Sequence, residues 1–252
     1  MLRTRIIPTL LLRNESLVKT KKFGEFTYIG DPCNTVRIFN ELEVDELLFL
    51  DITASKEKRV PNYELLRDIA SECFMPLAYG GGVTSLEQAK KILSIGFEKI
   101  SLNSSAICKR ELVKEISDQF GSQAVIVSID VKKNFWGTHC VATNNGTKLS
   151  DIPPVEWAKE LEKLGAGEIL VTSVDREGTW EGFDIELISS ISDAVNIPVI
   201  AHGGGGSVDD IGEAIVKGNA SAVALGSMVV YQKKGMGVLV SFPDKKQLDG
   251  II

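Results

Sequence analysis

The chain has few of the residues that characterise metal-binding and redox proteins. Its 252 residues include only four cysteines and two histidines. Cys33, Cys73, Cys108 and Cys140 are scattered without CxxC spacing, which predicts neither a zinc site nor a redox pair. No metal and no cofactor are therefore expected, and the thiols are interpreted as buried or surface groups in a reducing compartment.

Positive charge and long apolar runs are also scarce. Lys and Arg number 28 against 34 Asp and Glu, so the net charge is −6 at pH 7. This balance argues against a nucleic-acid partner, whose phosphate backbone requires a basic surface. No apolar stretch approaches the length of a membrane span. The N-terminal run MLRTRIIPTLLL is short, contains Pro8 and lacks a small-residue cleavage site, so we interpret it as a first buried strand of a soluble cytoplasmic protein.

What the chain does contain is a regular alternation of apolar and amphipathic segments. With 44% apolar and 25% charged residues and no Pro/Ser-rich linker, residues 1–252 are expected to form one domain. The continuous apolar runs, typical of parallel strands buried on both faces, are 5–12, 46–52, 76–80, 99–103, 123–130, 168–175, 198–203 and 221–226. The amphipathic segments between them are 32–43, 61–73, 85–96, 109–121, 153–165, 184–195 and 208–218. The alternation predicts a (β/α)8 TIM barrel, in which glycines and Pro243 after Met228 argue against a regular eighth helix.

Part of the first half of the chain recurs in the second half. Residues 75–106 align with residues 197–228 without a gap, at an offset of 122 positions (197 minus 75). The identities fall on prolines, glycines and serines, where backbone geometry demands rigid or small residues. The repeat predicts an α/β barrel built from two duplicated half-barrels, each with its own glycine-rich turn.

The carboxyl ends of the predicted strands should carry the chemistry, as they do in this fold. Asp51, Asp130 and Asp175 end three strands and are expected to converge on one mouth. Such a carboxylate cluster can support acid–base chemistry, although acidic residues also cap helices and brace loops. Both interpretations remain open for each of the three.

Two glycine-rich turns, at 80–82 and 203–206, each precede a predicted helix. Bare backbone N–H groups at a helix N-terminus favour an anion, and residues 103–104 and 226–227 would complete each cradle from the neighbouring strand. Two such sites predict a ligand with phosphates at opposite ends. The alternative is that the glycines only form tight turns.

Isolated polar residues near the predicted mouth have alternative interpretations. Lys19, in the loop after the first strand, either reaches a ligand phosphate or is solvated. His202 lies inside a glycine-rich turn, where a lone histidine is more often a hydrogen-bonded structural residue than a base. His139 is expected to be exposed.

The opposite face of the predicted barrel also carries charge. Four residues of alternating sign occupy the starts of four strands: Arg5, Glu46, Lys99 and Glu168. They predict a ring of ion pairs across the barrel floor, which in the absence of other information would be a stabilising network.

Several longer blocks point to one family. These are RIIPTLL, FLDITASKEKR, GGGV, SLNSSA, FGSQAVIVSIDVK, GAGEILVTSVDREGT and GGGG. In order, over about residues 1–230, they resemble the cyclase subunit of imidazole glycerol phosphate synthase, HisF. The resemblance implies a duplicated half-barrel with a HisH-like glutaminase docked under it. It also implies ammonia passing through the barrel to a bis-phosphorylated ribonucleotide at the top.

The resemblance assigns roles to individual residues. One phosphate would be bound by Gly82, Asn103 and Ser104, and the other by Glu177, Gly178, Gly204, Gly226 and Ser227. Asp130 matches the catalytic aspartate of the second half, and Lys19, Asp51 and Thr172 match supporting positions. Arg5, Glu46, Lys99 and Glu168 match a charged gate at the ammonia entrance.

The chain departs from the family pattern at the first catalytic aspartate, which is replaced by Leu11. Glu177 stands for an aspartate, His202 stands where the family tends to have a small residue, and GVLVSFP replaces the C-terminal helix. Losing half of an acid–base pair costs about 10²- to 10⁴-fold in rate. These departures resemble the WbuZ-type HisF-like proteins of surface-polysaccharide and nonulosonic-acid synthesis. There the barrel and its glutaminase would supply ammonia to a separate sugar amidotransferase that makes an acetamidino group.

Three functions follow from the resemblance. The first is an ammonia-channelling, lyase/cyclase-type subunit of a glutamine amidotransferase complex that serves sugar amidination. The second is a histidine-biosynthesis cyclase that uses Asp130, with Asp51 or His202 as a substitute acid. The third is a non-catalytic ammonia conduit and scaffold. A HisA-type sugar isomerase is less favoured, because it too would need an acid at Leu11.

Overall fold

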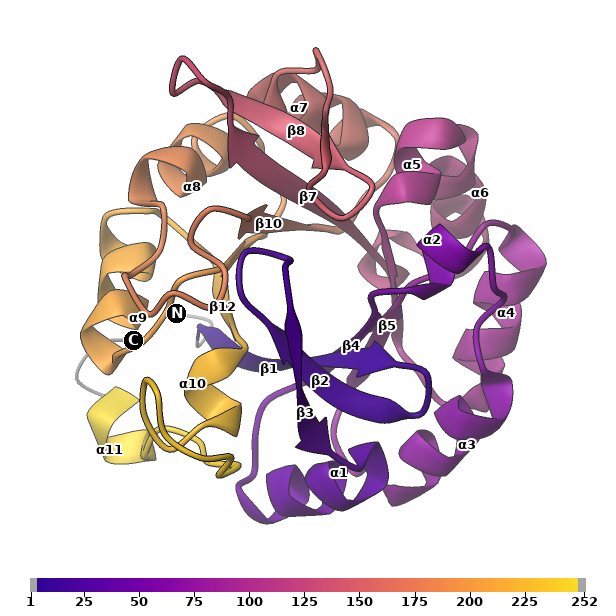
Figure 1. Ribbon diagram of the computed structural model, residues 1–252. Coiled ribbons are helices and arrows are strands. Elements are labelled where there is room, and N and C mark those ends of the chain that lie inside the picture. Colours follow the sequence, from indigo (N-terminus) through magenta and orange to yellow (C-terminus); the bar gives the residue numbers. More distant parts are fainter. Residues whose placement is uncertain (1–3, 249–252) are drawn as a thin grey trace.

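Eight parallel strands form a closed ring in the computed structural model, which describes residues 4–248 (Figure 1). The strands are β1 (Arg5–Arg13), β4 (Leu47–Asp51), β5 (Leu77–Gly80), β6 (Lys99–Leu102), β7 (Val125–Lys133), β10 (Glu168–Ser173), β11 (Val199–His202) and β12 (Ala222–Leu225). They pair in that order, β12 returns to β1, and the pairing of β7 with β10 joins the two halves. The predicted TIM barrel is therefore confirmed.

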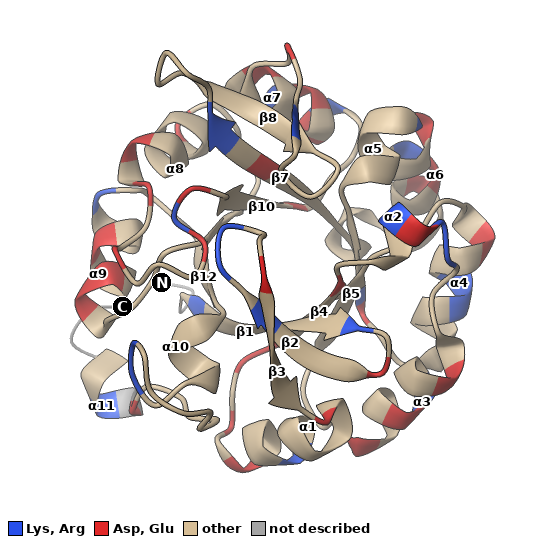
Figure 2. Cartoon of the chain, in the orientation of Figure 1, with Lys and Arg blue, Asp and Glu red and all other residues tan. Residues whose placement is uncertain are grey.

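Seven helices pack around the ring. They are α1 (Pro32–Glu41), α3 (Tyr63–Glu72), α4 (Leu86–Ile95), α6 (Glu111–Phe120), α7 (Pro154–Lys163), α8 (Ile185–Ser192) and α9 (Val208–Val216). Five of them begin at a residue whose side chain accepts a hydrogen bond from the first turn, namely Asp31, Asn62, Ser85, Asp184 and Ser207. Charged residues are concentrated on these outer helices and on the loops (Figure 2).

The duplication is visible in the backbone. β5 and β11 differ by the predicted 122 residues (199 minus 77), and each leads through a glycine turn into a serine-capped helix. Gly81 and Gly203 occupy matching positions and both have positive φ, at 118° and 89°. After the helices the offset becomes 123 (222 minus 99), because the second half has one more residue before its strand. The alignment without a gap is therefore wrong at its end, and Ser104 rather than Ser105 corresponds to Ser227.

Two hairpins were not predicted, and both rise from the carboxyl ends of strands. One contains β2 (Ser16–Thr20) and β3 (Phe26–Gly30) and lies across the barrel opening in Figure 1. The other is formed by an extension of β7 with β8 (His139–Thr143), which also pairs with β9 (Lys148–Leu149). The first places Lys19 on a strand rather than in a loop.

Short elements complete the chain. They are α2 (Ala54–Glu57), α5 (Ser104–Cys108), the 3₁₀ turn η1 (Ser122–Ala124), α10 (Ser227–Val230) and α11 (Lys245–Leu248). Neither α10 nor α11 is longer than one turn, so the described chain has no regular eighth helix, as the sequence indicated. Within residues 4–248, no helix combines the length and apolarity that crossing a bilayer requires.

The barrel interior is apolar. Its buried cluster consists of Ile7, Leu48, Ala78, Ile126, Leu170, Ile200, Ala222 and Ala224. Three of these are alanines, which leave more space along the axis than the bulky branched residues usual in this fold. A second, larger cluster fills the layer between the strands and the helices.

The glycine turn after β5 generates a stability prediction. A Cβ on Gly81 would lie 2.4 Å from the carbonyl oxygen of Asp51, whereas a Cβ on Gly137 would meet nothing within 4 Å. Both residues have positive φ. We expect Gly137→Ala to cost about 1 kcal/mol through backbone strain alone, and Gly81→Ala to cost about 3 kcal/mol or more because strain and a backbone clash add. Urea unfolding of both variants measures the difference, and equal losses would contradict the packing at Gly81.

Candidate functional site at the carboxyl ends of the strands

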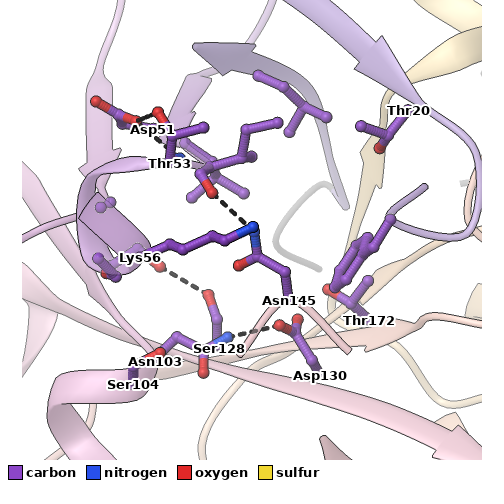
Figure 3. Close-up of a pocket in the computed structure, with 18 of the residues that line it drawn as sticks. Thr20, Asp51, Thr53, Lys56, Asn103, Ser104, Ser128, Asp130, Asn145 and Thr172 are labelled. Carbon is purple, nitrogen blue, oxygen red and sulfur yellow. Dashed lines mark hydrogen bonds between the residues drawn. The ribbon is translucent and has the colours of Figure 1, made fainter. Parts of the chain in front are cut away.

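A pocket of about 440 Å³ opens at the carboxyl ends of the strands. It is lined from both halves of the barrel, with Asp51 and Thr53 on one side and Asp130 and Thr172 on the other (Figure 3). Leu170 belongs both to the pocket wall and to the apolar cluster inside the barrel. The pocket therefore reaches down to the barrel interior.

Asp130 ends the inward-facing part of β7 and is held by two neighbours. Its carboxylate accepts a hydrogen bond from Asn103 Nδ2 at 2.8 Å, and Thr172 is its partner on the neighbouring strand β10. Burial raises the pKa of Asp130 from 3.8 to about 6; the side chains of Asn103 and Thr172 act in the opposite direction, and the charge of Glu177 adds to the increase. A carboxyl group that titrates near pH 6 can exchange protons close to neutrality.

His202 lies on the far side of Thr172 from Asp130. Its Nδ1 is 3.1 Å from the Thr172 hydroxyl oxygen, and the side chain lines the pocket. Burial lowers the pKa of His202 from 6.5 to about 4, with a further decrease from the Lys19 ammonium that Glu177 partly offsets. The ring is therefore neutral at neutral pH. This argues against His202 as a substitute acid, because a neutral imidazole is a poor proton donor.

Leu11 also lines the pocket, from β1. In the ring of eight strands β1 and β7 are four positions apart, so Leu11 faces Asp130 from the opposite side of the barrel. Leu11 is 7% exposed and offers only methyl groups there. The structure thus brings the two family positions together, and only one of them can transfer a proton.

Asp51 is engaged in local structure. Its Oδ1 accepts hydrogen bonds from the backbone N–H groups of Thr53 at 3.0 Å and Ala54 at 2.9 Å, and Arg59 lies 3.4 Å away. The carboxylate braces the turn into α2 while bordering the pocket. This arrangement favours a supporting role over that of an acid.

The first glycine turn opens into the pocket. Gly82 and its two glycine neighbours line it, together with Asn103 and Ser104 at the start of α5. Gly82 has a φ of 69°, and its N–H points to the Ser55 hydroxyl at 3.3 Å. Backbone groups and small hydroxyls therefore surround one corner of the pocket, as an anion cradle requires.

The second glycine turn does not open into this pocket. Gly178, Gly204, Gly226 and Ser227 are not among the residues that line the pocket. A Cβ on Gly204 would lie 2.1 Å from the carbonyl oxygen of Gly182, and one on Gly226 would lie 2.9 Å from Cε of Lys19. The loop after β10 and the side chain of Lys19 therefore cover the place where the second phosphate was predicted.

Lys19 forms a buried ion pair with Glu177. The two side chains are 5% and 2% exposed, and Nζ of Lys19 donates to Oε1 of Glu177. The other carboxylate oxygen of Glu177 accepts from the backbone N–H of Phe23 at 3.2 Å. Lys19 is thus not solvated, and the side chain of Glu177 holds the tip of the hairpin β2–β3, so a phosphate there would need backbone donors.

At the amino ends of the strands the four charged residues form the predicted ring. Arg5 lies 2.6 Å from Glu46 and 2.9 Å from Glu168, and Lys99 lies 2.8 Å and 3.2 Å from the same two carboxylates. Burial alone would lower the pKa of Arg5, but the charges of Glu168 and Glu46 raise it overall. One carboxylate oxygen of Glu168 is buried without a hydrogen-bond partner among the described residues.

Two residues differ from the expectations. Asp175 accepts a hydrogen bond from the backbone N–H of Lys133 at 2.8 Å and does not line the pocket, because the strand β10 ends before it. His139 is half-buried on β8 rather than exposed, with Nε2 3.1 Å from the Asp184 carboxylate that caps α8. Neither contact leaves a signal in local sequence.

Sequence reasoning also missed several pocket residues. Asn145, at a φ of 56°, donates to the carbonyl of Ile52 at 3.0 Å and brings the loop between β8 and β9 over the pocket. The hydroxyls of Ser101 and Ser128 are 2.7 Å apart in the pocket wall. The alternation of polar with apolar residues in the strands was the available signal for these serines. Within residues 4–248, no three His, Cys, Asp or Glu side chains are grouped to hold a metal ion.

The raised pKa of Asp130 predicts a pH-dependent stability. Because the folded-state pKa is about 6 and the ordinary value 3.8, the carboxyl group contributes stability at low pH that is lost as the pH rises from 4 to 6. Asp130→Asn removes this titration. We expect the variant to gain on the wild type by about 2 kcal/mol between pH 4 and pH 7, measured by urea unfolding. A difference that stays constant over this range would contradict the proposed environment of Asp130.

Comparison with known proteins agrees with the geometry. The family model for histidine biosynthesis proteins matches residues 5–235. A protein of Pseudomonas aeruginosa, provisionally named imidazole glycerol phosphate synthase subunit hisF2, is 51% identical over 99% of both chains. A Leptospira borgpetersenii protein, provisionally named subunit HisF of the same synthase, is 47% identical over 97% of this chain and 96% of its own. The imidazole glycerol phosphate synthase subunit HisF of Alkaliphilus metalliredigens is 41% identical over 98% of this chain and 96% of its own. The chain therefore belongs to the histidine biosynthesis protein family, as a member of its HisF branch.

Proposed function

We propose that this barrel is the synthase-side subunit of a glutamine amidotransferase complex. A HisH-like glutaminase docks under the floor, ammonia passes through the barrel, and the nitrogen serves the amidination of a sugar through a separate sugar amidotransferase. The observation that carries this proposal is that Leu11 lies opposite Asp130 in the pocket wall. A site that keeps the ammonia route but has one carboxyl group of the acid–base pair suits ammonia delivery better than ring closure.

The route for ammonia is supported by the barrel interior. A neutral molecule can cross apolar surroundings that an ion cannot. The ion-pair ring lies at the amino end, the apolar cluster with its three alanines follows, and Leu170 connects this cluster to the pocket. Arg5 is the most exposed member of the ring, with 27% of its side chain accessible. It is the member best placed to swing aside and admit ammonia.

A phosphorylated ligand is supported by the first glycine turn. The cradle formed by Gly82, Asn103 and Ser104 opens into the pocket. The second cradle would open only if Lys19 and the hairpin β2–β3 moved away from Gly226. We propose that a ligand phosphate drives this movement by attracting the Lys19 ammonium away from Glu177.

The second candidate is the cyclase subunit of imidazole glycerol phosphate synthase. It is favoured by the names of the relatives and by the position of Asp130. Against it stand the methyl groups of Leu11, the engagement of Asp51 in the turn to α2, and the neutral state of His202.

Replacing Leu11 by aspartate separates the two candidates. With ammonium salt as nitrogen source, we expect the wild-type barrel to form little imidazole product from the bis-phosphorylated ribonucleotide. Leu11→Asp should restore a carboxyl group opposite Asp130 and increase product formation by about 10²- to 10⁴-fold. Chromatography of the product measures both rates.

Leu11→Asn is the matched control, because it has the size and polarity of aspartate but cannot transfer a proton. It should show no gain. Wild-type turnover as fast as that of Leu11→Asp would overturn the proposal in favour of the histidine-pathway cyclase.

The docking of a glutaminase under the floor can be tested with two exposed phenylalanines. Phe74, 88% exposed, lies between α3 and β5 at the floor, and Phe135, 94% exposed, lies in the hairpin above the mouth. Buried aromatic anchors dominate interfaces, so Phe74→Asp should weaken binding of a HisH-like glutaminase by about 10-fold or more. Phe135→Asp should leave it unchanged. Calorimetric titration measures both, and the reverse pattern would place the partner at the mouth.

A further inference from the structure

Lys56 is a pocket cation without a counter-ion. It belongs to α2 and lines the pocket, and Figure 3 shows its side chain extending across the pocket towards Asn145. Within residues 4–248 its ammonium group has neither an ion pair nor a hydrogen bond. The carboxylate of the next residue, Glu57, is paired with Arg59 instead. A positive charge is therefore available to a ligand in the pocket.

The acidic side chains of the pocket do not need this charge. The carboxylates that line the pocket are those of Asp51, Glu57, Asp130 and Glu177. Arg59 pairs with the first two, and Lys19 pairs with the last. Asp130 accepts its hydrogen bond from Asn103 Nδ2. The pocket wall thus satisfies its carboxylates with other partners and leaves Lys56 unused.

The short helix that carries Lys56 packs directly against the first glycine turn. The Ser55 hydroxyl accepts a hydrogen bond from the N–H of Gly82 at 3.3 Å. A Cβ on Gly82 would lie 2.9 Å from Cβ of Ala54 and 2.7 Å from the carbonyl oxygen of Arg59. Contacts on both sides of Lys56 therefore fix this segment to the turn, and Lys56 belongs to the wall of the first cradle.

Three hydroxyl groups around the same turn have protons to donate. The Ser55 hydroxyl accepts from Gly82, while Ser104 and Ser105 line the pocket from α5. In the part of the chain that the structure describes, none of the three hydroxyls donates a hydrogen bond to another group of the protein. Each is free to turn its proton towards an acceptor in the pocket. Free donors beside an unpaired cation are the surroundings that an oxyanion requires.

The charge of a phosphate group explains why the cation matters. A phosphate monoester carries a charge of about −1.5 to −2 at neutral pH. The hydroxyl and backbone donors of the cradle are neutral, and the carboxylates of Asp51 and Asp130 in the same pocket repel an anion. Arg13, the other Lys or Arg that lines the pocket, is stacked on Phe26 of the hairpin β2–β3, 3.6 Å from the ring centroid. Lys56 is thus the cation that the cradle itself provides.

We propose that Lys56 completes an anion site with the hydroxyls of Ser55, Ser104 and Ser105, and that this site takes the phosphate group of a small-molecule monoester. The inference rests on the proposed function, which places a phosphorylated ligand in this pocket. It adds the side chain that supplies the positive charge and identifies α2 as the element that carries it.

Inorganic phosphate tests the site in the isolated chain, by calorimetric titration at constant ionic strength. Lys56→Gln should weaken binding by about 10-fold, because a charge-assisted hydrogen bond is lost. Lys56→Arg keeps the charge and should retain most of the affinity. A wild-type chain that does not bind phosphate, or a Lys56→Gln variant that binds it equally well, would overturn the proposal.

Lys58→Gln is the matched control. Lys58 is exposed and lies two residues from Lys56, but it does not line the pocket. The variant changes the net charge of the protein by the same amount and should bind phosphate as the wild type does. Equal losses in Lys56→Gln and Lys58→Gln would reveal only a long-range effect of charge and would overturn the site.

A double-mutant cycle locates the bound phosphate. Ser104→Ala removes a hydroxyl from the opposite side of the glycine turn. If one phosphate contacts both residues, the losses in Lys56→Gln and Ser104→Ala should not be additive. Additive losses would contradict a shared site. Arg13→Gln should have the smaller effect, and a loss larger than that of Lys56→Gln would place the phosphate at the hairpin and overturn the proposal.

Ribose 5-phosphate tests the class of ligand. It carries a phosphate monoester on a sugar, so Lys56→Gln should weaken its binding by the same factor as that of inorganic phosphate. Ribose, which lacks the charged group, should not bind. An effect of the variant on inorganic phosphate alone would show a site for the free ion and would overturn the monoester as the ligand.

These readouts need no partner protein, and circular dichroism checks that each variant is folded. If phosphate binding depends on Lys56 but no glutaminase binds the barrel, the proposed function fails while the anion site stands. If the glutaminase binds and Lys56→Gln leaves phosphate binding unchanged, only the role of Lys56 is overturned.

Discussion

The pairing of β7 with β10 is the constraint on which both ends of this barrel depend. Six residue pairs, from Glu168 with Ile126 to Ser173 with Val131, join the two halves of the ring. Strand β10 begins with Glu168, a member of the ion-pair ring, and reaches Thr172, beside Asp130, four residues later. At about 3.3 Å per residue the two levels are roughly 13 Å apart. A shift of this register by one residue would turn Glu168 and Thr172 out of the barrel together.

The two half-barrels share a backbone but no longer share chemistry. Gly81 and Gly203 still form matching turns, and Ser85 and Ser207 still cap matching helices. In the layer above the interior, however, one half presents two leucines, a glycine and a serine, and the other presents an aspartate, a threonine, a histidine and an alanine. Glycines and caps are required by the fold in both halves, whereas the polar layer is required only by function. The asymmetry therefore lies where the fold allows it.

The mouth is covered by the two hairpins that rise from β1 and β7. The Lys19–Glu177 pair holds the first of them over the second glycine turn. A buried ion pair contributes little net stability, since the loss of hydration offsets much of the attraction. Its effect here is positional, because the ammonium group is held against Gly226 and within reach of His202. The same lysine that shapes the electrostatics of the mouth thus controls access to one corner of it.

The sequence by itself determined the eight strands, the helices around them and the duplication. It also determined the end of the barrel at which polar residues gather, where the carboxyl ends of the strands meet. Hydrophobic patterns and glycine positions are local features, and each element could be recognised from its own residues. The same applies to the ring of Arg5, Glu46, Lys99 and Glu168, because three of them begin strands, Glu46 directly precedes β4, and parallel strands bring their beginnings together.

Only the tertiary structure decided which of these polar residues act on one another. Asp175 looked equivalent to Asp51 and Asp130 but does not line the pocket, and Lys19 is buried against Glu177 rather than solvated. Likewise the contacts from Asp130 through Thr172 to His202 join residues 42 and 30 positions apart (172 minus 130, and 202 minus 172). Proton positions and pKa values depend on distances of about 3 Å between separate strands, and no local pattern of residues contains such distances.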